Sequence, residues 1–331
     1  MAFASTVGLS IRGIVSVLPE NKEDNLSLAA IPKENREAIV NHTGIRFRYR
    51  VKNKQADVQT LFSEGVKELL TTLQWNKTSV DVIIVVTQTA ENKIPSVACA
   101  LQGDLDFDPQ VMAYDINLGC SGFVYGLHSC GHTLQSLGKN KARAILCCGD
   151  ISSHLTEDND LTVRPIFSDA VSVVGVEFNS DTSPAYFHFE TFGKGKQAIY
   201  SEVTKSGTWM RLNGIDIFNY SVQYVPENIK KLYDYFGVSM TETDLFILHQ
   251  ANLIINKSIV KSLGISKEKA PNTLYEYGNT ASASIPITLA VSANKEHKQI
   301  LLSGFGVGFS IATCLLELDG PILTKSILLD I

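Results

Sequence analysis

The sequence predicts an α/β protein in which buried strands alternate with amphipathic helices. Short runs such as VIIVV at residues 82–86 are apolar on both faces, which is typical of central strands covered by helices on each side. Segments with helical spacing of apolar residues lie between these runs. Two sets of strands also follow the same order along the chain, which indicates an internal duplication.

Nine segments carry the apolar and β-branched pattern of strands. They lie at residues 7–19, 81–88, 111–116, 143–150, 171–178, 185–192, 244–250, 299–305 and 309–318. Helical patterns are predicted at residues 57–74, 96–102, 121–137, 215–236, 252–263 and 281–295.

The duplication is visible as pairs of segments with a charged lead-in, an apolar strand and a polar end. SVDVIIVVTQTA corresponds to TETDLFILHQAN, KARAILCCGD to HKQILLSGFG, and AVSVVGVEF to FSIATCLLEL. Turn-forming residues in EFNSDTSPAY place the division near residue 180. We therefore expect an N-terminal half at residues 1–180 and a C-terminal half at residues 181–331.

Composition excludes several classes of protein. The 331 residues carry a net charge of −5 with mixed signs, whereas a nucleic-acid binder normally shows a basic stripe. The longest apolar runs are far shorter than the roughly 20 residues of a membrane span, and the first residues lack a signal-peptide pattern. Six cysteines, mostly inside apolar runs, are typical of reduced thiols. We expect a soluble cytoplasmic protein.

Cys120 stands in NLGCSGF, between a predicted strand and a predicted helix. The positive end of a helix dipole lowers the pKa of a thiol placed there, which favours a nucleophile. The alternative is a small buried hydrophobe, the common fate of a free cysteine. That interpretation suits the cysteines that lie inside apolar segments, namely Cys99, Cys130, Cys147, Cys148 and Cys314.

Three further segments place polar or flexible residues next to buried strands. His249 follows the apolar strand DLFIL, and open α/β sheets bind ligands at such strand ends, although a lone histidine is more often structural. Asn279 lies in YGNTASASIP, where it serves either as a helix cap or as a site residue. SGFGVGFS is followed by a strand rather than a helix, which disfavours a dinucleotide site and favours close backbone approach to a ligand.

Two weaker patterns can also be explained without a functional role. His128 and His132 are i, i+4 neighbours, but no H-E-x-x-H pattern surrounds them, so no metal site is predicted. The basic segment TGIRFRYRVKNK, residues 43–54, is either a solvated hairpin or a phosphate contact.

Taken together, NLGCSGF, HQAN, GNTASASIP and SGFGVGF resemble β-ketoacyl-acyl-carrier-protein synthase III, a condensing enzyme of the thiolase superfamily. The resemblance extends to LPENKEDN, NHTGIR and PSVAC, so it runs nearly from end to end. It implies the duplicated thiolase fold, with five αβαβα layers and two mixed sheets. It also implies a homodimer.

The resemblance implies a role for each site residue. Cys120 is the acylated nucleophile, and His249 and Asn279 donate hydrogen bonds to the carbonyl of the second thioester. The backbone N–H groups of Cys120 and Val307 form an oxyanion hole. An ionised aspartate at position 279 would repel an enolate, so asparagine favours carbon–carbon bond formation. The residues expected to contact substrate are Ile94, Leu212, Phe305, Gly306 and Phe309.

The chain departs from fatty-acid-initiating members at the adenine clamp of coenzyme A. Their Trp and Arg correspond here to Ala38 and approximately Leu161, and a basic residue for carrier docking corresponds to Ile254. Lys257 and Lys261 remain nearby, and Ile94 replaces a Phe that reaches into the partner's acyl tunnel. These changes favour a specialised synthase of secondary-metabolite or surface-glycolipid biosynthesis over a housekeeping one primed by acetyl-CoA.

The expected activity is a decarboxylative Claisen condensation of a Cys-bound acyl group with a malonyl- or β-ketoacyl-type thioester. The substrates would be acyl-CoA or acyl-carrier-protein phosphopantetheine thioesters, with no permanently bound cofactor and no metal. Two alternatives stay open. One is acyl transfer to an amine or hydroxyl without condensation, and the other is a non-catalytic partner subunit.

Overall fold

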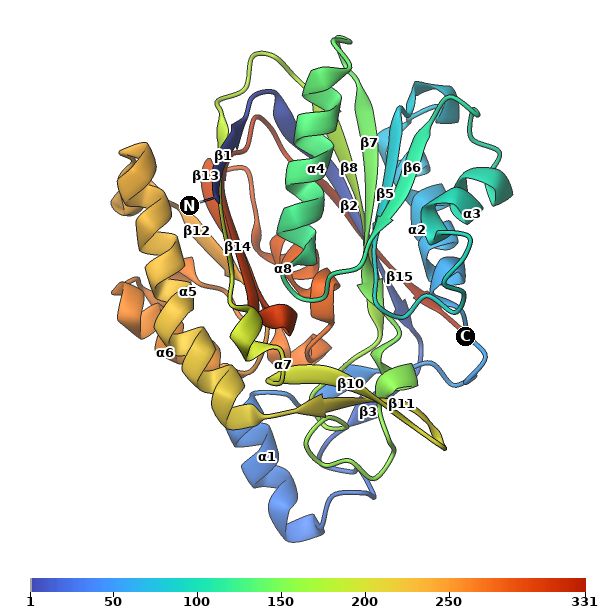
Figure 1. Cartoon of the computed structure of the whole chain (residues 1–331), viewed down its shortest axis with the longest axis vertical. Helices are drawn as coiled ribbons and strands as arrows, with labels where there is room; N and C mark the ends of the chain where they lie inside the picture. Colours follow the sequence, from blue (N-terminus) through green and yellow to red (C-terminus); the bar gives the residue numbers. More distant parts are fainter. Residues whose placement is uncertain (1) are drawn as a thin grey trace.

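A computed structural model describes residues 2–331, which form two β-sheets with helices between and outside them (Figure 1). The strands of the first sheet are β15 (Leu323–Leu329), β2 (Leu9–Pro19), β8 (Ala170–Phe178), β7 (Arg143–Asp150), β5 (Val82–Val86) and β6 (Met112–Ile116), in that spatial order. Those of the second are β1 (Ala2–Thr6), β9 (Ala185–Thr191), β14 (Ser310–Glu317), β13 (Gln299–Gly306) and β12 (Leu245–Leu248). Two small two-stranded sheets stand apart. One pairs β3 (Lys22–Asp24) with β4 (Phe47–Tyr49), and the other is the hairpin of β10 (Ile199–Thr204) and β11 (Gly207–Leu212).

The predicted duplication is confirmed by strand order and direction. In the first sheet β2 and β7 both run antiparallel to β8, and β5 runs parallel to β7. In the second sheet β9 and β13 both run antiparallel to β14, and β12 runs parallel to β13. Both sheets are therefore mixed, and four strands of one repeat the arrangement of four strands of the other.

Equivalent aspartates support the same repeat in atomic detail. Asp81 precedes β5, and its backbone N–H donates to the Arg143 carbonyl while its carboxylate accepts the Arg143 N–H at 3.0 Å. Asp244 precedes β12 and makes the same two bonds with Gln299, the carboxylate accepting at 3.0 Å. Each aspartate thus joins the starts of two parallel strands in its own sheet.

The helices complete five layers (Figure 1). They are α1 (Arg36–Thr43), α2 (Val58–Leu73), α3 (Val97–Asp104), α4 (Gly122–Ser136), α5 (Gly214–Phe236), α6 (Leu253–Leu263), α7 (Leu274–Tyr277) and α8 (Ser284–Ser292). Buried side chains of α4 and α8 share one core cluster with the facing sides of both sheets. Helices α2 and α3 pack on the outer face of the first sheet, and α5 and α6 on the outer face of the second. The predicted five-layer αβαβα architecture is confirmed.

The two ends of the chain cross between the halves. Strand β1 pairs with β9 of the second sheet, and β15 pairs with β2 of the first. The chain changes sheet between β8 and β9, at residues 179–184. The division near residue 180 stays a prediction, because β1 and β15 each complete the sheet of the opposite half.

The sequence patterns missed the short and exposed elements. Strands β1, β3, β4, β10, β11 and β15 and the helices α1 and α7 were not predicted. Five of the seven residues of β15 and four of the six residues of β10 are exposed, and none is fully buried, so neither strand carries the buried apolar run by which central strands are recognised. Within residues 2–331 no helix is long and apolar enough to cross a membrane.

Candidate active site

The three residues singled out by sequence lie around one cavity of about 190 Å³. Cys120 comes from the turn before α4, His249 from the end of β12, and Asn279 from the segment before α8. Because α4 and α8 lie between the sheets, these three segments meet at the centre of the molecule. The fold thereby brings Cys120 together with two side chains that lie 129 and 159 residues further along the chain.

Cys120 is held between helix α4 and the glycine-rich bend after β13. A Cβ on Gly306 would lie 3.2 Å from the Cys120 sulfur, and a Cβ on Gly304 would lie 2.7 Å from the Cys120 carbonyl oxygen. Gly306 also adopts φ 154°, a conformation that favours glycine. The bend can therefore approach the thiol only because side chains are absent at these two positions.

The expected lowering of the Cys120 pKa is wrong. The thiol is buried, and burial raises its pKa to about 12, with the nearby Asp150 carboxylate adding to the rise. Removing the sulfur from water disfavours the charged thiolate more than the start of the helix favours it. Cys120 is consequently a protonated thiol at neutral pH, and its proton must leave when it attacks.

His249 is oriented by a serine from the neighbouring helix. Its Nδ1 lies 2.7 Å from Ser284 Oγ, and its backbone N–H donates to the Ser303 carbonyl of β13. The Phe305 ring packs edge-on against the imidazole with ring centroids 5.3 Å apart. Burial lowers the pKa of His249 to about 3, so the ring is neutral at physiological pH. Since Ser284 occupies Nδ1, Nε2 is the ring nitrogen left for a ligand.

The Asn279 amide is also fixed by neighbouring groups. Its Oδ1 accepts the backbone N–H of Ala281 at 3.0 Å, and its Nδ2 donates to the Ala251 carbonyl at 3.3 Å. An amide carries two N–H bonds, so one remains for a ligand in the cavity. This arrangement presents Asn279 as a donor rather than an acceptor.

Two serines tie the start of α4 to the glycine-rich bend. Ser310 Oγ donates to the Val307 carbonyl at 2.8 Å and lies 2.7 Å from Ser121 Oγ. Because the Ser310 proton is committed to Val307, Ser121 donates to Ser310. These bonds hold the backbone of Val307 in register with that of Cys120.

The other expected substrate contacts divide between the cavity and its surroundings. Leu212, Phe305 and Gly306 line the cavity of Cys120. Val307 lines a smaller adjoining cavity that also reaches Cys120. Phe309 is buried against Tyr220 and does not line either cavity, and Ile94 is 87% exposed, away from both. The expectation of a direct contact by Phe309 is therefore not supported within one chain.

Sequence reasoning missed Ser284 and Ser310. Both lie within segments that it had singled out, five residues after Asn279 and three after Val307. Serines are common at helix starts and turns, so nothing distinguished these two before the strands and helices were packed together.

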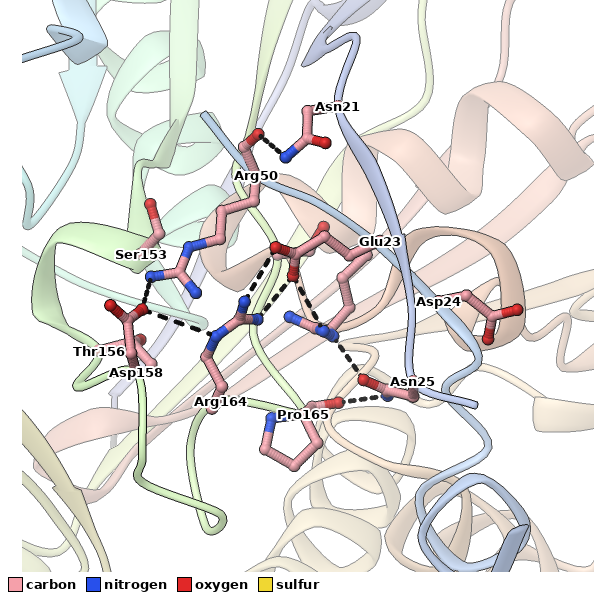
Figure 2. A network of polar contacts seen from close by, with 12 residues as sticks. Asn21, Glu23, Asp24, Asn25, Arg50, Ser153, Thr156, Asp158, Arg164 and Pro165 are labelled. Carbon is pink, nitrogen blue, oxygen red and sulfur yellow. Dashed lines mark hydrogen bonds and ion pairs between the residues drawn. The ribbon is translucent and has the colours of Figure 1, made fainter. Parts of the chain in front are cut away.

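The basic segment at residues 43–54 is only partly solvated, because its arginines pair with carboxylates of the protein (Figure 2), whereas Lys52 and Lys54 stay exposed. A phosphate contact by this segment stays a prediction. Arg48 is only 1% exposed and donates from Nε to Asn25 at 2.9 Å, while its Nη2 lies 3.1 Å from Glu23 without hydrogen-bond geometry. Arg164 makes two bonds to the same Glu23, at 2.6 and 2.9 Å. Arg50 pairs with Asp158 at 2.8 Å. This network anchors the β3–β4 sheet to the loop after β7.

The remaining cysteines and the histidine pair of α4 are placed as follows. Cys99 is exposed rather than buried, whereas Cys130, Cys147, Cys148 and Cys314 are buried as predicted. His128 and His132 stack with ring centroids 6.0 Å apart, and His128 packs against Phe187. Within residues 2–331 no group of three or more His, Cys, Asp or Glu side chains is arranged to hold a metal ion.

The positions that differ from the adenine clamp lie on the surface. Ala38 on α1 and Leu161 in the loop after β7 are both exposed. On α6, Ile254 is exposed together with Lys257 and Lys261. All five positions are therefore available to an incoming substrate or carrier.

Comparison with known proteins agrees with this geometry. Residues 114–195 match the family model of 3-oxoacyl-[acyl-carrier-protein (ACP)] synthase III, and residues 234–318 match the model of its C-terminal part. A β-ketoacyl-[acyl-carrier-protein] synthase III 2 of Bacillus anthracis is 31% identical over 324 residues, covering 93% of this chain and 98% of that protein. The synthase III of Coxiella burnetii is 30% identical over 322 residues, with the same coverage of 93% and 98%.

A solved structure extends the comparison to three dimensions. The 3-oxoacyl-(acyl-carrier protein) synthase of Burkholderia xenovorans LB400 superposes with a TM-score of 0.91 at 29% identity, covering 98% of this chain and 99% of that one. The matched residues include Cys120, His249 and the glycine-rich bend. The chain belongs to the β-ketoacyl-acyl-carrier-protein synthase III family of thiolase-fold condensing enzymes.

Proposed function

We propose that this protein is an acyltransferase that extends a Cys120-bound acyl group by decarboxylative Claisen condensation with a malonyl-type thioester. One observation carries the proposal. A single cavity is lined by a thiol, a neutral imidazole and an amide with one uncommitted N–H. A β-ketoacyl-type thioester is a second possible extender in the same cavity.

In the first half-reaction the Cys120 sulfur attacks the carbonyl of the donor thioester. The bond between that carbonyl and the donor sulfur breaks, and the proton of the Cys120 thiol leaves with the released donor thiol. The backbone N–H groups of Cys120 and Val307 stabilise the tetrahedral oxyanion. The link from Ser121 through Ser310 to Val307 supports this role, because it holds the two backbones together.

In the second half-reaction the malonyl-type thioester loses CO₂ and leaves an enolate. His249 Nε2–H and the free Asn279 N–H stabilise the negative oxygen. This role assigns the Nε2–H tautomer to His249, in which the Ser284 hydroxyl donates to Nδ1 at 2.7 Å while accepting the Gln250 N–H at 3.4 Å. The enolate carbon then attacks the acyl carbonyl on Cys120, and the departing thiolate takes up a proton.

We propose that the acyl donor is a carrier-protein thioester rather than acetyl-CoA, in specialised secondary-metabolite or surface-glycolipid biosynthesis. The support is chemical: Ala38 and Leu161 offer no aromatic or guanidinium plane for stacking on an adenine. Lys257 and Lys261 supply exposed positive charge on α6, the helix that follows His249 in the chain. Phosphopantetheine thioesters of the carrier or of coenzyme A would be the substrates, with no cofactor held between turnovers.

We also propose a homodimer. Strand β6 ends the first sheet with an unpaired edge, and such edges are normally covered. Ile94 projects from the loop after β5 and is 87% exposed, which suits a residue that completes the partner's acyl tunnel. The halves at residues 1–180 and 181–331 would each carry part of the site.

The decisive experiment is the intact mass of the protein after exposure to acyl-CoAs and acyl-carrier proteins, followed by addition of malonyl carrier. An acyl adduct absent in Cys120→Ala, together with a β-ketoacyl product and CO₂, is the expected result. An ester or amide product without CO₂ would instead establish acyl transfer to a hydroxyl or amine. No adduct from any donor would point to a non-catalytic subunit, to be pursued with a search for its partner.

A further inference from the structure

The second half of the molecule has no counterpart of strand β6. In the first half α3 is followed by β6, which pairs with β5 in parallel. In the second half α6 is followed by residues 264–273, which contain no strand, and β12 is the last strand of its sheet. A cavity of about 540 Å³ opens at this place, lined by residues of α6, by residues of the segment 265–272 and by Leu248 at the end of β12. We call it the α6 cavity.

The α6 cavity is distinct from the active site, although α6 borders both. Asn252 and Ile255 line the Cys120 cavity, whereas Leu253 and Lys257 line the α6 cavity, and no described residue lines both. Figure 1 shows α6 and β6 on opposite sides of the molecule, so a partner subunit paired through β6 would not cover the α6 cavity. Its walls therefore belong to one chain.

The walls of the α6 cavity are mostly aliphatic. They are formed by six apolar residues, Leu248, Leu253, Val260, Ile265, Ala270 and Pro271. The uncharged polar members are Asn256 and Asn272, and among the described residues no aromatic side chain takes part. A nucleotide or a sugar needs stacking surfaces or many polar partners, whereas an alkyl chain needs neither. The lining therefore favours an alkyl chain.

Three lysines complete the lining of the α6 cavity. Lys257 and Lys261 lie about one helical turn apart on α6, and Lys267 comes from the segment that follows α6. All three are exposed, and the lysines that form ion pairs within residues 2–331 lie elsewhere. No carboxylate of the described chain lines the cavity, since Glu268 is exposed and is not among its lining residues. Like charges at i, i+4 repel each other, so an anionic group held between them is stabilised.

The length of the α6 face determines the size of the chain that fits. Leu253 and Val260 are seven residues apart, which corresponds to about 10 Å along the helix axis, similar to a medium-length alkyl chain. We propose that the α6 cavity binds a medium-chain fatty acid, with the alkyl chain along the aliphatic walls and the carboxylate among the three lysines. This inference rests on the cavity and not on the proposed condensation. Because Lys257 and Lys261 are also proposed to contact a carrier protein, fatty acid and carrier would compete for them.

Isothermal titration calorimetry of the full-length protein tests the two parts of the site separately. The probes are decanoate and uncharged decan-1-ol, which share the alkyl chain. Decanoate should bind more tightly than decanol, because only decanoate interacts with the lysines. Added salt should weaken the binding of decanoate alone, since it screens exposed charges.

Lysine variants identify the anionic part of the site. Lys257→Ala, Lys261→Ala and Lys267→Ala combined should weaken the binding of decanoate about tenfold, since each exposed charge contributes a few-fold. The binding of decanol should be unchanged. The matched control combines three exposed lysines that line neither cavity, Lys33→Ala, Lys77→Ala and Lys295→Ala, and it should leave both affinities unchanged.

A cavity-filling variant and a photoreactive probe locate the alkyl chain. Val260→Phe should weaken the binding of decanoate and decanol alike, whereas Val291→Phe, at an exposed valine of α8, should change neither. A diazirine analogue of decanoate should cross-link to residues that line the α6 cavity. No binding of decanoate, equal affinity of the three-lysine variant and the wild type, or cross-links confined to the Cys120 cavity would overturn the proposal. A protein that binds decanoate as expected but acquires no acyl group on Cys120 would refute the proposed function alone.

Discussion

The two halves of the molecule share one framework and carry different chemistry. Strands β5, β7, β8 and β2 repeat as β12, β13, β14 and β9, and the bonds from Asp81 to Arg143 repeat as those from Asp244 to Gln299. Central helices α4 and α8 follow equivalent paths between the sheets. The segment before α4 holds Cys120, whereas the segment before α8 holds Asn279.

The two segments differ in what fixes the state of the side chain: burial for the Cys120 thiol, and hydrogen bonds to the backbone for the Asn279 amide. The Cys120 thiol is buried and its pKa is raised to about 12, so this half stores an uncharged nucleophile. The Asn279 amide has one N–H and its oxygen bound to the backbone, and it is left with a single directed donor. The duplicated fold thus brings the starts of two helices to the same cavity, where one presents the nucleophile Cys120 and the other the hydrogen-bond donor Asn279.

The largest expected effect is that of removing the Cys120 thiol, which separates the activity that needs Cys120 from the one that needs His249 and Asn279. Cys120→Ala should abolish acylation and condensation, because no other cysteine lines the cavity within residues 2–331. Decarboxylation of a malonyl thioester should survive, since it uses His249 and Asn279. Mass spectrometry and CO₂ release measure the two activities, and loss of both together would show that the halves do not act separately.

The second prediction concerns the raised pKa of Cys120. At pH 7 a thiol of pKa about 12 has a thiolate fraction on the order of 10³-fold below that of an ordinary thiol of pKa about 8.5. Alkylation of Cys120 by iodoacetamide should be correspondingly slow and should still rise through pH 10. Exposed Cys99 provides the reference in the same digest. A plateau of the Cys120 rate near pH 8 would contradict the burial effect.

The third prediction tests the donor half. Asn279→Ala should slow condensation about 10²–10³-fold, the typical cost of removing one oxyanion donor. Acyl loading of Cys120 should stay within about threefold of wild type. Asn279→Asp should be at least as slow, because an ionised carboxylate offers no donor to the enolate. Equal losses of loading and condensation would place Asn279 in the first half-reaction instead.

The smallest expected effect lies in the framework. Asp81→Ala and Asp244→Ala should each lower the free energy of unfolding by about 1–3 kcal/mol, since each carboxylate accepts backbone N–H groups. Backbone hydrogen bonds from Lys298 and Gln299 hold the pKa of Asp244 below its usual value. The stabilisation of the folded protein by ionised Asp244 is therefore present above about pH 4 and is lost as the pH falls further.

Denaturant unfolding at pH 7 and pH 3 checks this prediction. The cost of Asp244→Ala should shrink at the lower pH. If only one of the two substitutions lowered the free energy of unfolding, the two aspartates would share a geometry without contributing equally to stability.

The sequence alone determined the alternation of buried strands and helices, the repeat, and the motifs around Cys120, His249 and Asn279. These features depend on local chemistry, because a run such as VIIVV is apolar wherever it packs and glycine permits close approach in any fold. The exposed strands β10 and β15 have no such run, so their pairing was visible only in the sheet.

Only the tertiary structure decided the protonation state of Cys120, the orientation of His249 by Ser284, and the pairing of the basic segment with Glu23 and Asp158. Each depends on which groups surround an atom, and the nearest groups come from distant parts of the chain. A helix start suggested a thiolate, but burial acts in the opposite direction and prevails. The local sequence pattern thus identified the reactive residues, whereas the exclusion of water by packing determined their protonation states.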